Sequence, residues 1–331
     1  MSRTPRAAIV GAGLMGRWHA HACRRAGGQV VAVVDMDAAA AARLARTCGG
    51  AAHAASFGAL PATTQIDIVH VCTPGETHVG AIGDALARGC PVIVEKPLAP
   101  DASATYAMIL AAQQAGLWIV PVHQAVYQDG ARAALAWARQ KRLRVFDYRA
   151  CSAGADGSPD RADLVAAEIL PHPLALLQVL SPEAFDKLAW DVRRPAPGEL
   201  MATTVAGDVL VRLLVSLHAR PTRHDLTLLA DEGSMVADLF HGYAWQEPGA
   251  RPTRLTKVTR PFTAAAVSAG HAAVNLARRT MDREPAYPGL TALVAAAYRA
   301  LDDSHQRPLS DAHTLAVARA RDAILRRASV G

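Results

Sequence analysis

Residues 7–27 read AAIVGAGLMGRWHAHACRRAG, and this stretch decides the fold. Its first four residues are apolar and predict a short buried strand. Gly11, Gly13 and Gly16 then stand in the spacing G-x-G-x-x-G, and a helix is predicted over 14–25. In this spacing the first glycine permits a tight turn, the second lets the backbone approach a pyrophosphate, and the third lets the helix pack closely on the strand. The free N–H groups at the start of the helix favour an anion there.

A glycine motif of this kind is weak alone, but the residues after it supply the expected context. The stretch QVVAVVDMD, residues 29–37, predicts a second strand that ends at Asp35. An acid at this position can accept hydrogen bonds from the hydroxyls of an adenine ribose. Its carboxylate would repel a 2′-phosphate, and neither Met36 nor Asp37 is an arginine that could bind one. The sequence therefore predicts NAD as the cofactor, in preference to NADP.

Predicted strands and helices continue to alternate up to residue 124. Because the strands are continuously apolar, they indicate a parallel sheet that helices cover on both faces. We therefore expect a doubly wound α/β unit in this part of the chain. The predicted helices lie near 38–47, 77–88 and 102–116, and the further strands over 66–73, 90–96 and 117–124.

Polar residues follow three of these strands at the point where each ends. They occur in CTPGETH (72–78), EKP (95–97) and HQ (123–124). Ligands of open parallel sheets bind outside the carboxyl ends of the strands, so we expect these segments at one edge, beside the cofactor. Lys96 is a cation that can stabilise an alkoxide or exchange a proton there. Pro97 fixes the chain direction just after it.

The composition is that of a globular chain with two domains. Of its 331 residues, 51% are hydrophobic and 19% charged, and single cores seldom grow beyond this length. We place a dinucleotide-binding domain at 1–124 and a substrate-binding and oligomerisation domain at 125–331. The five cysteines are widely spaced and form no CxxC pair, so we expect no disulfide framework and no metal site. A reducing cytoplasm fits this pattern.

Neither a nucleic acid nor a membrane is an expected partner. The net charge is +6, but the basic residues are scattered, and the densest run, RQKRLR at 139–144, has no interleaved aromatic residues. No apolar run approaches the ~20 residues needed to span a bilayer.

From residue 125 onward the pattern changes to one helix followed by several strands. Short turn sequences such as AGD and DEGS separate adjacent strands and predict an antiparallel sheet. One face of such a sheet packs on helices while the other can associate with a second subunit, so we expect a homodimer or homotetramer. The predicted elements are a helix at 129–142, a strand at 143–153, a loop at 154–163, strands at 187–194, 199–207, 208–219, 223–239 and 253–261, and helices at 263–280, 289–302 and 311–328.

Taken in order, these motifs resemble the family of glucose-fructose oxidoreductase and inositol dehydrogenase, often written Gfo/Idh/MocA. The resemblance is close in the first half of the chain and general in the second. It implies an α/β Rossmann domain followed by an α+β domain with an open, mainly antiparallel sheet. The segments that carry it are GAGLMGRWHA (11–20), Asp35, CTPGETH (72–78), EKP (95–97) and DLVAAEILPHPLALL (163–177).

The resemblance implies NAD-dependent hydride transfer between nicotinamide and a secondary alcohol or ketone of a sugar, cyclitol or related polyol. Lys96 would lie near the nicotinamide and the reacting oxygen. The family's second catalytic element, an Asp followed four residues later by a His, matches Glu168 and His172. His172 would exchange a proton with the substrate hydroxyl while the carboxylate polarises it, both on one helical face if the segment is helical. Glu168 carries one methylene more than Asp, and the glycines usual around this motif are missing.

Further binding residues follow from the same resemblance. The family often has an Arg/Lys-Phe-Asn-Pro type of segment where this chain has HQAVYQDG. The residues expected to bind the cofactor are Gly11, Gly13, Leu14, Met15, Gly16, Asp35, Cys72, Thr73, Pro74, His78, Glu95 and Lys96, and those expected to bind substrate are His123, Gln124 and Tyr127.

Two other functions fit the same residues. One is redox-assisted glycoside hydrolysis, in which bound NAD is transiently reduced and regenerated. The other is a non-catalytic nucleotide-sensing subunit, which the substitution at Glu168 favours and the retention of Lys96 and His172 opposes.

Overall fold

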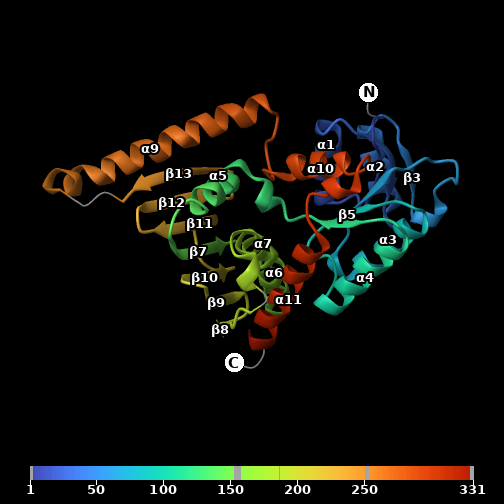
Figure 1. The fold of residues 1–331 in the computed structure, drawn as a ribbon. Helices are drawn as coiled ribbons and strands as arrows, with labels where there is room; N and C mark the ends of the chain where they lie inside the picture. Colours follow the sequence, from blue (N-terminus) through green and yellow to red (C-terminus); the bar gives the residue numbers. More distant parts are fainter. Residues whose placement is uncertain (1–2, 153–157, 186, 250–252, 329–331) are drawn as a thin grey trace. The chain divides into compact units, whose positions relative to one another are not determined.

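The computed structural model describes residues 3–152, 158–185, 187–249 and 253–328, which form two compact units (Figure 1). Unit 1 comprises Met1–Val122 and Leu290–Ala318, and unit 2 comprises His123–Gly289 and Arg319–Gly331. The first boundary lies two residues before the expected one. The sequence predicts one continuous second domain, but residues 290–318 belong to unit 1 instead.

Unit 1 is built on a parallel sheet with the strand order β3-β2-β1-β4-β5-β6, as predicted for a Rossmann domain. The order reverses between β1 and β4, so the loops after these two strands lie side by side at the carboxyl edge. Its strands are β1 (Arg6–Val10), β2 (Gln29–Val34), β3 (Ala52–Ala54), β4 (Ile68–Val71), β5 (Val92–Val94) and β6 (Ile119–Pro121). Its helices are α1 (Leu14–Arg25), α2 (Ala38–Thr47), α3 (His78–Ala87), α4 (Ala102–Gln114) and α10 (Leu290–Arg299).

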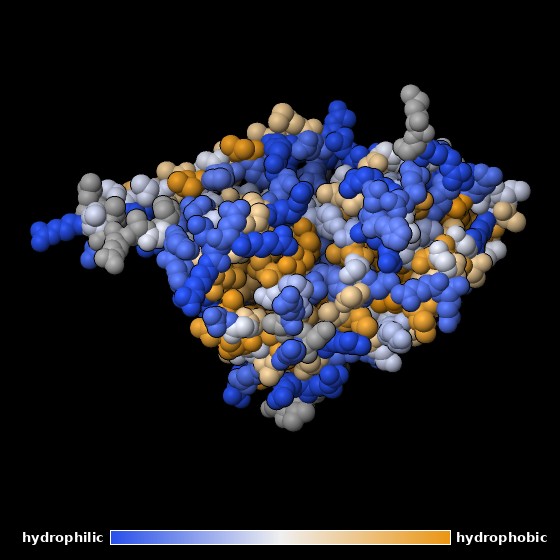
Figure 2. Space-filling view, viewed as in Figure 1, coloured by the Kyte–Doolittle hydropathy of each residue, from blue (hydrophilic) through white to orange (hydrophobic). Residues whose placement is uncertain are grey.

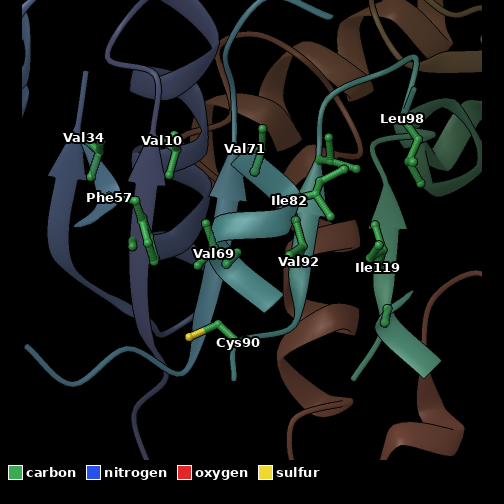
Figure 3. Close-up of a cluster of buried hydrophobic side chains, with 14 of the residues drawn as sticks. Val10, Val34, Phe57, Val69, Val71, Ile82, Cys90, Val92, Leu98 and Ile119 are labelled. Atoms are coloured by element: carbon green, nitrogen blue, oxygen red, sulfur yellow. The ribbon is translucent and has the colours of Figure 1, made fainter. Parts of the chain in front are cut away.

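Alternate side chains of these strands enter two cores. On one face, buried residues of the strands pack against α3 and α4, and Figure 3 shows Val69, Val71 and Val92 in the same cluster as Ile82 of α3. Complete burial of one such side chain contributes about 1.5–3 kcal/mol, so this cluster holds the sheet and the two helices together. On the opposite face, α1 packs on the central strands and on α10 (Figure 1). Residues 290–299 therefore complete the core of unit 1.

Unit 2 contains a mixed sheet with the order β13-β12-β11-β7-β10-β9-β8. Among the described strands of this sheet, only the central pair β7–β10 is parallel, which confirms a mainly antiparallel sheet. The strands are β7 (Leu143–Cys151), β8 (Asp191–Arg193), β9 (Glu199–Ala206), β10 (Val209–Ser216), β11 (Arg223–Ala230), β12 (Gly233–Asp238) and β13 (Tyr243–Pro248). The helices are α5 (Asp129–Ala138), α6 (Pro159–Ile169), α7 (Pro171–Leu180), α8 (Pro182–Phe185) and α9 (Arg254–Met281), while α11 (Asp311–Ala328) runs from unit 1 into unit 2.

Two local predictions in unit 2 are wrong. Residues 253–261, predicted as a strand, lead into and begin α9, although Pro261 lies inside that helix. β-Branched residues lower helix propensity only slightly, and the edge of the sheet is already occupied by β13, which pairs with β12 from Gly233 to Asp238. The loop predicted at 154–163 is helical from Pro159, where α6 begins. Residues 154–157 of that prediction lie outside the described part of the chain.

The sheet of unit 2 has one covered and one open face. Phe146 and Tyr148 of β7 are fully buried on the covered face. On the open face Val205 and Leu210 are 56% and 60% exposed. Apolar side chains are also exposed along α9, where Figure 2 shows them among hydrophilic ones. The stretch Arg161–Leu180 is apolar and long enough to cross a membrane by length and composition, but half of it is buried within the structure, as in a core helix.

Candidate active site

The turn after β1 has the geometry that a bound pyrophosphate requires. Gly11 has φ +99°, and a Cβ there would lie 2.7 Å from the carbonyl carbon and oxygen of Cys72. A Cβ at Gly16 would lie 1.8 Å from the carbonyl oxygen of Gly11. In contrast, nothing lies within 4 Å of a Cβ at Gly13, which precedes the first turn of α1 and is exposed. The first and third glycines therefore allow close packing, while the second faces open space beside the helix N-terminus.

Asp35 is hydrogen bonded directly to this turn. The backbone N–H of Ala12 donates to its Oδ2 at 2.6 Å, and the N–H of Asp37 donates to Oδ1 at 2.8 Å. Each carboxylate oxygen keeps a further lone pair, because a carboxylate offers about four acceptor positions. Asp35 is thus fixed beside the glycine turn with acceptor capacity for two ribose hydroxyls.

His78 connects the loops after β4 and β5. Its Nε2 lies 2.8 Å from the carbonyl oxygen of Thr73, and its Nδ1 lies 2.8 Å from the carbonyl oxygen of Pro97. The imidazole is 1% exposed, so it fixes both loops from within rather than presenting itself to a ligand. Thr73 Oγ1 is also buried, but it has no hydrogen-bond partner among the described residues. Its hydroxyl therefore has unused hydrogen-bonding capacity at this loop.

The other expected cofactor residues in unit 1 lie around the same turn and loops. Leu14, at the first position of α1, is 55% exposed, and Met15 beside it is half-buried. Pro74 is exposed after β4. Cys72 is buried, and this burial, together with the charge of Glu95, raises the pKa of its thiol well above the usual value.

Glu95 and Lys96 follow β5 at the same edge. Lys96 is half-buried, and its peptide bond to Pro97 is cis. Glu95 is 8% exposed, and its Oε2 accepts the backbone N–H of Lys96 at 3.2 Å. Burial tends to raise the pKa of Glu95, but the hydrogen bond from His19 and the charges of His19 and Lys96 outweigh it and hold the pKa below the usual value.

Three residues that the sequence analysis did not single out connect to Glu95 through hydrogen bonds. They are His19 of α1, His70 of β4 and Tyr298 of α10, and they form a buried hydrogen-bonded row. The available signal was His70, a polar residue in the middle of an otherwise apolar strand.

In unit 2 the pair Glu168 and His172 is divided between two helices. Glu168 belongs to α6 and His172 to α7, with Leu170 between the two helices. Pro171 has no N–H to donate to the carbonyl oxygen of Ala167, and Arg321 Nε donates to that oxygen instead, at 3.3 Å. Leu170 itself keeps helical backbone angles, φ −53° and ψ −37°, so the prolines remove hydrogen bonds here without turning the chain out of the helical conformation.

His172 belongs to a small aromatic group on the covered face of the sheet. Its ring centroid lies 5.7 Å from that of His224 on β11. His224 Nε2 in turn hydrogen bonds to the hydroxyl of Tyr148 on β7. His224 and Tyr148 are candidate functional residues that the sequence analysis missed, because nothing in their own strands marks them.

The expected substrate residues after β6 also belong to unit 2. His123 is 3% exposed, while Gln124 and Tyr127 are half-buried in a short 3-10 helix, Gln124–Tyr127. Gln124 Oε1 is buried and has no hydrogen-bond partner within the described ranges. No group of three or more His, Cys, Asp or Glu that could hold a metal ion occurs in the part of the chain that the structure describes.

Comparison with known proteins agrees with this geometry. Residues 5–123 match the model of the Gfo/Idh/MocA oxidoreductase family, described as an NAD-binding Rossmann fold. This part of the chain is therefore similar to that family. The chain is 35% identical over 118 residues to an inositol 2-dehydrogenase of Arthrobacter, covering 35% of each chain. It is 40% identical over 107 residues to that of Leifsonia xyli, covering 31% of each. The match thus spans about a third of the length of these relatives.

Solved structures of the same fold cover nearly the whole chain. The UDP-N-acetylglucosamine 3-dehydrogenase of Acidithiobacillus ferrooxidans superposes with a TM-score of 0.74 over 99% of both chains, at 18% identity. The myo-inositol dehydrogenase of Lactobacillus casei, solved with NAD(H) and myo-inositol, gives 0.69 over 98% of this chain and 94% of its own, at 16% identity. At these identities the likeness establishes the fold, including that of unit 2.

The residues of unit 1 fit the NAD that this family binds. Gly13 leaves open space where a pyrophosphate would approach the helix N-terminus, and Asp35 has free acceptor positions beside it. Thr73 supplies an unused hydroxyl at the adjacent loop. Unit 1 is therefore an NAD-binding Rossmann domain.

Proposed function

We propose that the protein is an NAD-dependent dehydrogenase that transfers hydride between the nicotinamide and a secondary alcohol or ketone of a sugar, cyclitol or related polyol. The observation that carries this proposal is the meeting of three features at one sheet edge: the open space at Gly13, the anchored Asp35 and the half-buried Lys96. The inositol 2-dehydrogenase relatives support the substrate class.

NAD, when bound, supplies the hydride acceptor or donor. The chain binds it through the N–H groups at the start of α1, through the carboxylate of Asp35 and through the hydroxyl of Thr73. Leu14, Met15, Cys72 and Pro74 line the same turn and loops, and His78 keeps the loops after β4 and β5 together. Asp35 and His78 are hydrogen bonded to the backbone before any ligand arrives, so they hold this site in the orientation that the cofactor needs.

Lys96 acts on the reacting oxygen of the substrate. Alcohol oxidation develops negative charge on that oxygen, and an ammonium group stabilises it. His172 exchanges the hydroxyl proton, since an imidazole is able to donate and accept near neutral pH. The ring of His224 packs against this imidazole and orients it, and Glu168, four residues before His172, is the carboxylate proposed to polarise it. His123, Gln124 and Tyr127 contribute polar groups for substrate hydroxyls.

The test measures NADH absorbance during turnover with a panel of polyols, sugars and cyclitols. With an active substrate, Lys96→Met and His172→Ala are each expected to reduce kcat about 100-fold or more, the usual size for loss of an acid–base or charge-stabilising group. NADH binding, measured by fluorescence, should persist in both variants. The matched controls are the exposed residues Lys187 and His271, changed to Met and Ala respectively, which should keep full turnover. Unchanged turnover in both site variants would refute the assignment.

We further propose a homodimer or homotetramer in the cytoplasm. The open face of the unit 2 sheet supports association, because the exposed side chains of Val205, Leu210 and Leu229 gather there. All five cysteines are free, which is consistent with a reducing compartment. Light scattering on wild type and Leu210→Asp tests the interface: loss of the oligomer in the variant is expected, and a monomeric wild type would contradict the proposal.

A further inference from the structure

Four buried polar side chains in unit 1 form a continuous row. Glu95 Oε1 lies 3.1 Å from His19 Nε2, and His19 Nδ1 lies 3.0 Å from His70 Nδ1. His70 Nε2 lies 3.0 Å from the hydroxyl oxygen of Tyr298. Both imidazoles are 0% exposed, and Tyr298 is 6% exposed. Burying such a row costs free energy unless every polar atom in it has a hydrogen-bond partner.

With an ionised Glu95 and a neutral His19, only one direction of hydrogen bonding satisfies the row. A carboxylate only accepts, so His19 Nε2 carries a hydrogen and donates to Glu95. In a neutral His19, Nδ1 then accepts from Nδ1–H of His70, and His70 Nε2 accepts from the hydroxyl of Tyr298. Burial holds the pKa of His70 well below its usual value, so this imidazole is neutral as the assignment requires.

The far end of the row is also occupied. Cys23 of α1 hydrogen bonds to the Tyr298 hydroxyl, and burial raises the pKa of this thiol to about 11, so it remains protonated. Tyr298 is packed tightly, because a Cβ at Gly28 would lie 2.6 Å from its ring. The tyrosine thus has little freedom to turn its hydroxyl away from His70.

The near end of the row reaches the backbone of Lys96. Glu95 uses Oε1 for His19 and Oε2 for the N–H of Lys96, so its carboxylate is held between α1 and the residue after β5. The titratable groups that act on Glu95 are His19 from α1, Cys72 after β4 and Lys96 itself. Of these, only His19 donates a side-chain hydrogen bond to it among the described contacts.

We propose that His19, His70 and Tyr298 are positioning residues of the dehydrogenase: their hydrogen bonds hold the carboxylate of Glu95 in one orientation against the backbone of Lys96. The proposal rests on the function of Lys96 proposed above. His19 acts directly on Glu95, whereas His70 and Tyr298 act through His19 by fixing which of its nitrogens carries the hydrogen. None of the three is a catalytic residue.

The first measurement follows the Glu95 carboxyl in the apo protein, by carbon-13 NMR of labelled glutamate with assignment through Glu95→Gln. In His19→Leu the donor is lost while burial remains, so the pKa of Glu95 should rise above its usual value. His19→Gln should retain a low pKa, because an amide can donate to Glu95 and accept from His70. Tyr298→Phe removes the hydroxyl that donates to His70 Nε2 and so sets the direction of the hydrogen bonds. It should raise the pKa of Glu95 by less than His19→Leu does. Tyr106→Phe, an exposed tyrosine on α4, is the control and should not change it.

The second measurement is the pH dependence of turnover in the same variants. In His19→Leu we expect kcat to fall about tenfold near neutral pH, with KM changed much less, and to recover as the pH rises and Glu95 ionises. His19→Gln should restore most of kcat. A loss that is equal at every pH, or a Glu95 pKa that neither His19→Leu nor Tyr298→Phe changes, overturns the proposal.

The two proposals fail separately. If Lys96→Met turns over as wild type while the Glu95 pKa shifts as expected, then the positioning row is real and the role of Lys96 is wrong. Should His19→Leu fail to fold, the unchanged Glu95 pKa of Tyr298→Phe would by itself refute the row, and a raised pKa would support it.

Discussion

The glycine turn allows a matched pair of substitutions whose effects should separate completely. Gly13→Ala and Gly16→Ala each add one methyl group, three residues apart in the same turn. At Gly16 the new Cβ would lie 1.8 Å from the backbone oxygen of Gly11, about 1.6 Å short of ordinary contact. Since the obstacle is backbone rather than a flexible side chain, α1 must move away from β1. Overpacking of this kind costs about 3 kcal/mol.

At Gly13 the same methyl group meets nothing within 4 Å, and the backbone there, with φ −71° and ψ −156°, is allowed for alanine. Removing a glycine from such a position stabilises a protein by about 0.4–1 kcal/mol through the unfolded state. The methyl group would instead occupy the space that the pyrophosphate needs. NADH affinity should fall about tenfold or more, equivalent to about 1.4 kcal/mol.

Thermal unfolding of the apo protein and NADH fluorescence titration distinguish the two effects. For a domain the size of unit 1, a cost of 3 kcal/mol lowers Tm by about 6–12 °C, and this is expected for Gly16→Ala only. Gly13→Ala should keep or slightly raise Tm while losing NADH affinity. If Gly13→Ala binds NADH as tightly as wild type, the pyrophosphate does not lie against Gly13 and the reasoning is refuted.

Three further results are expected. Asp35→Asn should weaken NADH binding about tenfold, and it should reduce the preference for NADH over NADPH because the repulsion of a 2′-phosphate is lost. The exposed Asp84→Asn is the control and should change neither. An Asp35→Asn variant with the wild-type ratio of NADH to NADPH affinity would contradict this. His78→Leu should lower stability by about 1–3 kcal/mol, because the carbonyl oxygen that accepts its ring N–H loses its donor, and it should weaken NADH binding. The exposed His53→Ala is the control, and a wild-type urea midpoint would count against the connecting role. Burial depresses the pKa of His70 well below its usual value, and that of His313 to about 4. Below about pH 6.5 the unfolded chain therefore binds protons that the folded chain does not. The free energy of unfolding should fall there by up to about 1.4 kcal/mol per pH unit for each of these two histidines. His70→Asn should show a smaller slope in denaturant titrations, and an unchanged slope would show that His70 is not the source.

Sequence patterns predicted the features that depend on neighbours along the chain. Gly11, Gly13 and Gly16 encode one turn by their spacing, and Asp35 follows at the end of the next strand, so the cofactor site could be inferred without coordinates. The fold of the second half followed from turn residues between apolar runs.

Features that depend on distant partners were not predicted. Residues 253–261 have a composition compatible with a strand, but β13 already pairs with β12, so they begin a helix instead. His70 looked like a single polar residue in an apolar strand, because its partners His19 and Tyr298 lie 51 and 228 positions away. The division of Glu168 and His172 between α6 and α7 depends on the hydrogen bonds that two prolines remove, which spacing alone does not determine.

The return of residues 290–318 to unit 1 has a consequence for synthesis on the ribosome. When residue 122 has emerged, α1 still lacks α10, and the surface around Cys23 and His70 that Tyr298 later covers is open to water. At ordinary elongation rates the missing helix follows only about 10–40 s later, after most of unit 2. The NAD-binding domain is therefore expected to complete its core only after most of unit 2 has been synthesised, although its sequence is translated first.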